Sequence, residues 1–103
     1  MSEKNSPQPR RVLVTGGARR IGAALVESLH EAGMQTAIHY RESHGDAEHL
    51  AGKLNQKRPG STSIHQGDLD DCTTPSRLID EVVEHHGGLD VLINNASSFY
   101  PTP

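Results

Sequence analysis

The chain of 103 residues has few aromatic side chains: Tyr40, Phe99 and Tyr100 make up the 3%, and tryptophan is absent. Its hydrophobic core must therefore be built from valine, leucine, isoleucine and alanine. A chain of this length forms one domain at most and buries roughly 65% of its unfolded surface when it folds compactly. A core is possible, but with so few large rings it is expected to be thin.

Other features are also missing, and each absence excludes a class of protein. No apolar run approaches the ~20 residues of a membrane span, and residues 1–11 lack the apolar segment of a secretory signal. The single cysteine, Cys72, cannot form an internal disulfide or a cysteine-based zinc site, so a cytoplasmic location is expected. The histidines show no metal-ligand spacing. A net charge of -3 without a basic stretch argues against general nucleic-acid binding.

Short apolar runs alternate with segments of helical periodicity along residues 10–103. Residues 1–9 are polar and contain two prolines, which predicts a flexible lead-in. Strands are predicted where apolar and β-branched residues cluster, at residues 11–15, 36–40, 61–66 and 89–94. Helices are predicted between them, at about residues 20–32, 47–54 and 74–86.

The helical segments carry apolar stripes and terminal signals. In the first helix, Ile21, Leu25 and Leu29 recur at helical spacing and are expected to face the sheet. The third helix is expected to begin with Thr74 as its N-cap and Pro75 at its first position.

The order β-α-β-α-β-α-β predicts an α/β fold, in which right-handed crossovers build a parallel sheet with helices on both faces. This is the N-terminal half of a Rossmann-type doubly wound sheet. A fourth strand beside the first would have a neighbour on its other side, and none is encoded. The sequence is therefore expected to be truncated before the second half of such a fold.

A glycine-rich turn joins the first strand to the first helix, with the sequence Thr15-Gly16-Gly17-Ala18-Arg19-Arg20-Ile21-Gly22. Glycines let the backbone approach a ligand, and a helix N-terminus presents free N–H groups and a positive dipole to an anion. Arg19 and Arg20 add positive charge at the same place. A phosphate-binding turn is favoured, and an ordinary turn with solvated arginines is the alternative.

The segment His39-Tyr40-Arg41-Glu42-Ser43 ends the second strand, where a dinucleotide-binding fold selects its cofactor. An acid there binds the ribose hydroxyls, whereas an arginine accommodates a 2′-phosphate. Arg41 and Ser43 favour NADPH, while Glu42 is a conflicting signal. A solvated surface loop is the alternative.

Two more strand ends carry candidate ligand contacts. Asp68 follows the third strand, where its carboxylate can accept from an adenine amino group or cap its own turn. Asn94 and Asn95 follow the fourth strand, and ligands of open α/β sheets bind at such carboxyl ends. Beyond them, Ser97 offers a hydroxyl and Phe99 a ring on which a flat ligand can stack.

Together these residues resemble the short-chain dehydrogenase/reductase superfamily and, within it, the pteridine reductases, over essentially all of residues 10–103. The superfamily's turn is usually T-G-x-x-x-G-x-G, and Arg20 in place of the middle glycine is typical of pteridine reductases. The segment 94–103, NNASSFYPTP, resembles their signature after the fourth strand. The residues from His39 to Arg41, with Ser43, resemble their NADPH-binding segment.

The resemblance implies an NADPH-dependent reductase of dihydrobiopterin, biopterin or folate that forms a homotetramer. It implies cofactor contacts from the turn and from three strand ends: Gly16, Arg19, Arg20, Ile21, Gly22, Tyr40, Arg41, Ser43, Asp68, Leu69, Asn95, Ala96 and Ser97. It also implies substrate contacts from Arg20, Ser97 and Phe99, with the pterin held between the nicotinamide and the ring of Phe99.

The catalytic pair of the superfamily, spaced Y-x-x-x-K, has no counterpart in this chain. Tyr40 is followed four residues later by His44, and Tyr100 has no residue at that spacing. Family members are much longer than this chain, so we expect it to be the cofactor-binding N-terminal part of a reductase. Two alternatives stay open: a short-chain reductase of another carbonyl or imine, and a non-catalytic module that binds nucleotides or another subunit.

Overall fold

The computed structural model describes residues 10–96, in which strands and helices alternate. In chain order they are β1 (Arg11–Val14), α2 (Arg20–Glu31), β2 (Gln35–Tyr40), α3 (His44–Lys57), β3 (Thr62–Gln66), α4 (Thr74–His86) and β4 (Val91–Ile93). The strands pair in parallel in the order β3-β2-β1-β4. The predicted α/β fold, the N-terminal half of a Rossmann-like sheet, is confirmed. The lead-in 1–9 and the predicted contacts Ser97 and Phe99 lie outside the described residues.

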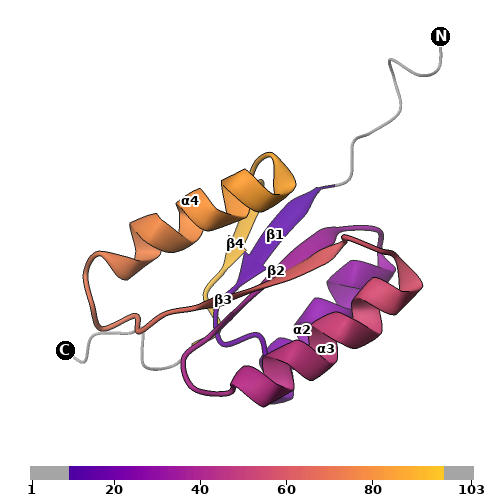
Figure 1. Ribbon diagram of the computed structural model, residues 1–103, viewed down its shortest axis with the longest axis horizontal. Coiled ribbons are helices and arrows are strands. Elements are labelled where there is room, and N and C mark those ends of the chain that lie inside the picture. The colour runs from indigo at the N-terminus through magenta and orange to yellow at the C-terminus, as the bar shows by residue number, and fades with distance from the viewer. Residues whose placement is uncertain (1–9, 97–103) are drawn as a thin grey trace, which may run out of the picture.

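The molecule has three layers, with α2 and α3 on one face of the sheet and α4 on the other (Figure 1). Because side chains of a strand alternate between faces, neighbouring residues of β1 and β2 enter different layers. Val12 and Ile38 face α2 and α3, whereas Leu13 and Ala37 face α4.

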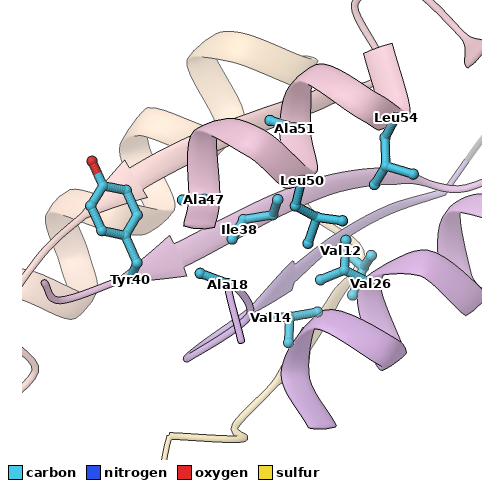
Figure 2. Close-up of a cluster of buried hydrophobic side chains, with 10 residues drawn as sticks. All are labelled: Val12, Val14, Ala18, Val26, Ile38, Tyr40, Ala47, Leu50, Ala51 and Leu54. Atoms are coloured by element: carbon cyan, nitrogen blue, oxygen red, sulfur yellow. The ribbon is translucent and has the colours of Figure 1, made fainter. Parts of the chain in front are cut away.

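The layer between the sheet and helices α2 and α3 is a closed apolar cluster (Figure 2). Val26 of α2 and Leu54 of α3 are almost fully buried against the strands. Ten side chains form this cluster, namely Val12, Val14, Ala18, Val26, Ile38, Tyr40, Ala47, Leu50, Ala51 and Leu54. As the composition predicts, the core consists mainly of aliphatic side chains, and Tyr40 supplies its one phenol ring.

The layer under α4 is more polar. Its buried apolar residues are Leu13, Ala37, Leu78 and Val82. Beside them a chain of side-chain contacts crosses from the sheet to the helix, through Gln35, His86, Ser63, His65 and Glu81. The successive distances are 2.8 Å (Gln35 Oε1 to His86 Nδ1), 2.9 Å (His86 Nε2 to Ser63 Oγ), 2.7 Å (Ser63 Oγ to His65 Nε2) and 2.9 Å (His65 Nδ1 to Glu81 Oε1).

The predicted stripe of α2 is only partly correct, because Leu29 packs against the core whereas Ile21 does not. Ile21 is 71% exposed, and the buried positions are instead Gly22, Val26 and His30. Gly22 lies so close to the glycine-rich turn that a Cβ there would overlap the carbonyl oxygen of Gly16. Only a glycine permits this approach, so it sets the rotation of the helix.

The predicted start of α4 and extent of the last strand are each displaced slightly. The N-cap is Thr73 rather than Thr74, and both Thr73 N (2.9 Å) and Thr73 Oγ1 (2.8 Å) donate to Asp71 Oδ1 in the turn before the helix. The last strand is confined to Val91–Ile93. Asp90, just before it, accepts instead from Arg11 N and Nε, both at 2.9 Å.

Candidate functional site

A cavity of about 230 Å³ lies at the carboxyl ends of β1 and β2, between the glycine-rich turn and the start of α3. This is the edge of a parallel sheet where α/β proteins bind ligands. Five of the predicted cofactor contacts line it, together with two residues that were not predicted as contacts: Gly16, Arg19, Tyr40, Arg41 and Ser43, with Ala18 and Glu42.

The turn needs its glycines for specific geometric reasons. Gly16 has a φ of +63°, and a Cβ there would lie 3.2 Å from the Cα of Ala96. At Gly22 a Cβ would overlap Gly16 O and lie 2.7 Å from Asn95 Nδ2. These positions let the turn, the first helical residues and the end of β4 come together without side chains between them.

Arg20 occupies a left-handed backbone conformation, with a φ of +57°, at the start of α2. A non-glycine residue there costs roughly 1–2 kcal/mol, and the superfamily usually places a glycine at this position. The backbone N–H groups of Arg20, Ile21 and Gly22 open the helix and have no partner one turn earlier within it. They are the donors that can face an anion, and the exposed Arg20 side chain adds charge beside them.

Thr15 connects the end of β4 to the glycine-rich turn through hydrogen bonds. Its Oγ1 accepts from Asn95 N (2.9 Å) and Ala96 N (3.2 Å), and its own N–H donates to Ile93 O (3.0 Å). Asn95 Nδ2 also donates to Gly16 O (3.1 Å). The structure thus brings the predicted contacts Asn95 and Ala96 beside the turn. Thr15 itself was not predicted as a site residue, although a hydroxyl ending an apolar strand is a signal for one.

At the end of β2, Tyr40 and Ser43 contribute in different ways. Tyr40 is buried in the core, and its hydroxyl lies 2.7 Å from His44 Nδ1, so only part of the ring borders the cavity. Ser43 is the N-cap of α3 but its side chain makes no capping hydrogen bond. Its hydroxyl can therefore bind a ligand in the cavity.

The arginines at the cavity are paired with carboxylates through contacts that solvent reaches. Arg19 Nε lies 3.5 Å from Asp46 Oδ2, and Arg41 Nη2 lies 3.6 Å from Asp68 Oδ2. All four side chains are about half exposed, and such ion pairs contribute at most about 1 kcal/mol. An incoming phosphate can therefore replace either carboxylate as the partner of its guanidinium. The main chain of Arg41 is held separately, because Gln66 Nε2 donates to its carbonyl oxygen (3.0 Å).

Asp68 and Leu69, predicted together at the adenine, face different surroundings. Asp68 Oδ1 accepts from Asp70 N (2.9 Å), so this oxygen caps its own turn, as the alternative interpretation had it. The other carboxylate oxygen faces Arg41. Leu69 instead lines a small apolar recess of about 30 Å³ under α4, with Leu78 and Leu92 among its neighbours.

His39 is a buried polar residue that sequence reasoning did not select for a site of its own. Its Nδ1 accepts from Gly16 N (3.0 Å), and its Nε2 lies 2.8 Å from Gly67 O. These partners fix the neutral tautomer with the proton on Nε2. Burial of the ring lowers the pKa of His39 below its ordinary value, although the Gly67 carbonyl opposes this shift.

Residues 10–96 contain neither a metal-binding cluster nor a membrane-spanning helix. No cluster of three or more histidine, cysteine, aspartate or glutamate side chains in this range is arranged to hold a metal ion. No helix in it is both long and apolar enough to cross a membrane. Cys72 is exposed and unpaired with another cysteine.

A parallel sheet with a glycine-rich turn between its first strand and first helix is typical of dinucleotide-binding folds. The chain is a member of the short-chain dehydrogenase family, whose family model matches residues 10–102. Members of this family bind nicotinamide cofactors.

Several reductases are similar to the chain. Pteridine reductase 1 of Leishmania tarentolae is 41% identical over 115 residues, which cover 95% of this chain and 40% of that protein. The 3-oxoacyl-[acyl-carrier-protein] reductase FabG of Staphylococcus aureus is 37% identical over 87 residues, covering 84% and 35%. Versicolorin reductase 1 of Aspergillus parasiticus is 32% identical over 96 residues, covering 93% and 36%. The chain thus spans less than half the length of these relatives.

Proposed function

We propose that the chain binds NADPH in the cavity beside the glycine-rich turn and forms the cofactor-binding part of a pteridine reductase. The observation that carries the cofactor proposal is the meeting of two cationic side chains, Arg19 and Arg41, with the Ser43 hydroxyl at this cavity. A phosphate there gains charge-assisted hydrogen bonds that a ribose hydroxyl does not.

In this arrangement, Arg41 and Ser43 hold the 2′-phosphate, and the first N–H groups of α2 hold the pyrophosphate with help from Arg20. Asp68 borders the adenine, and so does the neighbouring Leu69, although its side chain also lines the recess under α4. Asn95, Ala96 and Ser97 border the ribose and nicotinamide, which supplies the hydride when the cofactor is bound.

Glu42 opposes this cofactor assignment because its carboxylate shares the cavity with Arg41. A carboxylate repels a 2′-phosphate and can instead accept from the ribose hydroxyls of NADH. With two arginines at the cavity, we expect attraction for the phosphate to win. Comparing the two cofactors in the same protein therefore measures the balance directly.

The substrate proposal rests on the similarity to pteridine reductase 1 and on the predicted contacts Arg20, Ser97 and Phe99. A second candidate is the reduction of another carbonyl compound, because FabG and versicolorin reductase 1 are also similar to the chain.

The two candidates are separated by following NADPH consumption by the protein in its full natural length. Dihydrobiopterin, folate and a 3-oxoacyl thioester are offered in turn, each with NADPH and with NADH. We expect turnover of the pteridines with NADPH. Turnover of the thioester alone establishes the second candidate, and cofactor binding without any turnover points to a non-catalytic nucleotide-binding module.

Phe99→Ala is a more specific test of the pteridine substrate. Loss of an offset-stacked ring removes about 0.5–1.5 kcal/mol beyond the buried area, so pterin binding to the NADPH complex should weaken several-fold. NADPH affinity should stay nearly unchanged, whereas Arg20→Ala should weaken both ligands. Unchanged pterin affinity in Phe99→Ala contradicts the stacking role and removes the main residue-level support for a pteridine.

The proposal also includes a cytoplasmic location and a homotetrameric protein. The free, exposed Cys72 suits a reducing compartment, and the tetramer follows from the resemblance alone. Light scattering on the full natural length tests the assembly, and a monomer or dimer refutes it.

A further inference from the structure

His39 connects two loops that come from distant parts of the sequence. Along β2 it points to the same face as Ala37, and its imidazole is only 2% exposed. One ring nitrogen accepts from Gly16 N in the glycine-rich turn, and the other donates to Gly67 O in the segment after β3. The backbone adds to this connection, since Gly17 N donates to His39 O (2.9 Å).

Both partners of the ring are themselves held from a second side. Gly16 O accepts from Asn95 Nδ2, so the peptide groups flanking Gly16 are fixed from both β2 and the end of β4. Gly67 packs against α4 so closely that a Cβ would lie 2.6 Å from Thr74 Cγ2, and its N–H donates to Tyr40 O (3.0 Å). The imidazole therefore sets the distance between two loops that have little freedom to adjust on their own.

These loops bracket the proposed cofactor site. The turn leads into the first N–H groups of α2, and the segment after Gly67 carries Asp68, which faces Arg41. The Gly16 and Gly17 N–H groups are occupied by His39, which leaves the helical N–H groups as donors to a pyrophosphate.

We infer that His39 is a positioning residue for dinucleotide binding, which holds the phosphate-binding turn and the adenine-side loop at the separation that the cofactor spans. The inference rests on the proposed function, because it needs a dinucleotide bound between these two loops. A residue of this kind touches no ligand and acts through the geometry of the groups that do.

Two conservative variants separate the two bonds. In His39→Asn, the side-chain oxygen can take the place of Nδ1 and accept from Gly16 N, but the side chain is too short to reach Gly67 O. In His39→Gln, the side-chain amide can reach Gly67 O but leaves Gly16 N without its acceptor. The matched control is His30→Gln, since His30 is also 2% exposed and lies 2.7 Å from Ser61 Oγ, away from the cavity.

The experiment measures, on the chain in its full natural length, the unfolding free energy and the affinities for NADPH and for adenosine 2′-monophosphate, which lacks the pyrophosphate. Each His39 variant should bind NADPH about threefold to tenfold more weakly, the effect of one hydrogen bond. His39→Asn should lose affinity for the 2′-monophosphate as well, because the loop after Gly67, which carries Asp68, is released. His39→Gln should lose affinity mainly for NADPH, because the released turn contacts the pyrophosphate. His30→Gln should lower stability and leave both affinities unchanged.

If the His39 variants lose stability but keep wild-type affinities, His39 is a packing residue and the inference is overturned. If the His39 variants fail to fold, nitrogen NMR of the wild-type protein tests the inference instead. In its NADPH complex, His39 should carry its proton on Nε2 and show a coupling across the hydrogen bond from Gly16 N to Nδ1, and a protonated Nδ1 or a missing coupling overturns the inference. A wild type that binds neither NADPH nor NADH refutes the proposed function itself, an outcome distinct from the others.

Discussion

Within residues 10–96, the core cluster between the sheet and helices α2 and α3 contains ten buried side chains, whereas the cluster between the sheet and α4 contains four. Both counts include side chains of the strands. On the α4 side the remaining contacts are largely polar, through His65, Ser63 and His86. Apolar side chains there also stay in contact with solvent, with Ile79 37%, Val83 42% and Leu92 47% exposed.

The difference shows that one sheet can be stabilised by two kinds of interaction. Burial of apolar surface depends little on pH, whereas burial of the His65 and His86 rings favours their neutral forms, so that protonating them in the folded protein costs free energy. The α2 and α3 face should therefore determine overall stability, and the α4 face, with His65 and His86, should contribute the larger part of the response of stability to acid. The candidate site lies where the two layers meet at the carboxyl ends of the strands.

The largest effect is expected from Leu54→Ala, which removes a side chain 1% exposed in the α3 layer. A truncation of this kind costs about 2–5 kcal/mol, because transfer energy is lost and a cavity remains. The matched variant on the α4 face, Val83→Ala, should change stability by no more than about 0.5 kcal/mol because Val83 is largely exposed. Urea unfolding measures both, and similar losses would erase the contrast between the faces.

An intermediate effect is expected from His86, whose pKa is lowered from 6.5 to about 4, first by burial and then by the nearby charges of His85, His65 and Arg11. Between these pH values the unfolded chain binds a proton that the folded chain does not. The contribution of His86 to the free energy of unfolding is therefore complete above pH 6.5 and is lost as the pH falls toward 4. After allowance for partial exposure of the ring, this contribution is on the order of 1–2 kcal/mol.

His86→Gln should remove this contribution and flatten the dependence of unfolding free energy on pH in that window. The pKa values of His30, His39 and His65 are also lowered by burial, so a slope of the same sign remains. The control is His49→Gln, an exposed histidine on α3. An unchanged slope in His86→Gln contradicts the assignment of acid sensitivity to the α4 face.

A smaller effect on the free energy of unfolding, of opposite sign, is expected from Arg20 at the carboxyl edge of the sheet. Arg20→Gly removes a side chain from a left-handed conformation and should stabilise the protein by about 1 kcal/mol. The same variant should bind NADPH more weakly, since it loses a guanidinium beside the phosphate-binding N–H groups. Unfolding and titration measure the two effects, and a destabilised variant shows that the Arg20 side chain contributes more than its backbone conformation costs.

Local patterns were sufficient to predict the order of the elements and the place of the turn. The run from Val12 to Val14 and the glycines at 16 and 17 carry these predictions within a few residues of sequence. The rotation of α2 was not predictable in this way, because it depends on the contact of Gly22 with Gly16. A glycine that lets a helix approach its neighbour closely has no side chain, so it leaves no signal in the hydrophobic periodicity.

The candidate site was predictable where a residue acts through its type and its place at a strand end. Arg41 and Ser43 are of this kind, and both line the cavity. His39 and Thr15 were missed because their roles depend on partners that are distant in sequence, such as Gly67 and Asn95. A polar residue within an apolar strand is the signal that could have indicated both.

We propose that Arg41 selects NADPH by pairing with its 2′-phosphate, and titration of NADPH and NADH against the wild type and Arg41→Ala tests this selection most directly. Arg41 is about half exposed and its main chain is held by Gln66, so its truncation should leave the fold intact. Loss of a charge-assisted contact predicts NADPH binding weakened by about tenfold or more, with NADH binding changed by less than about twofold. Equal losses for the two cofactors would contradict the account.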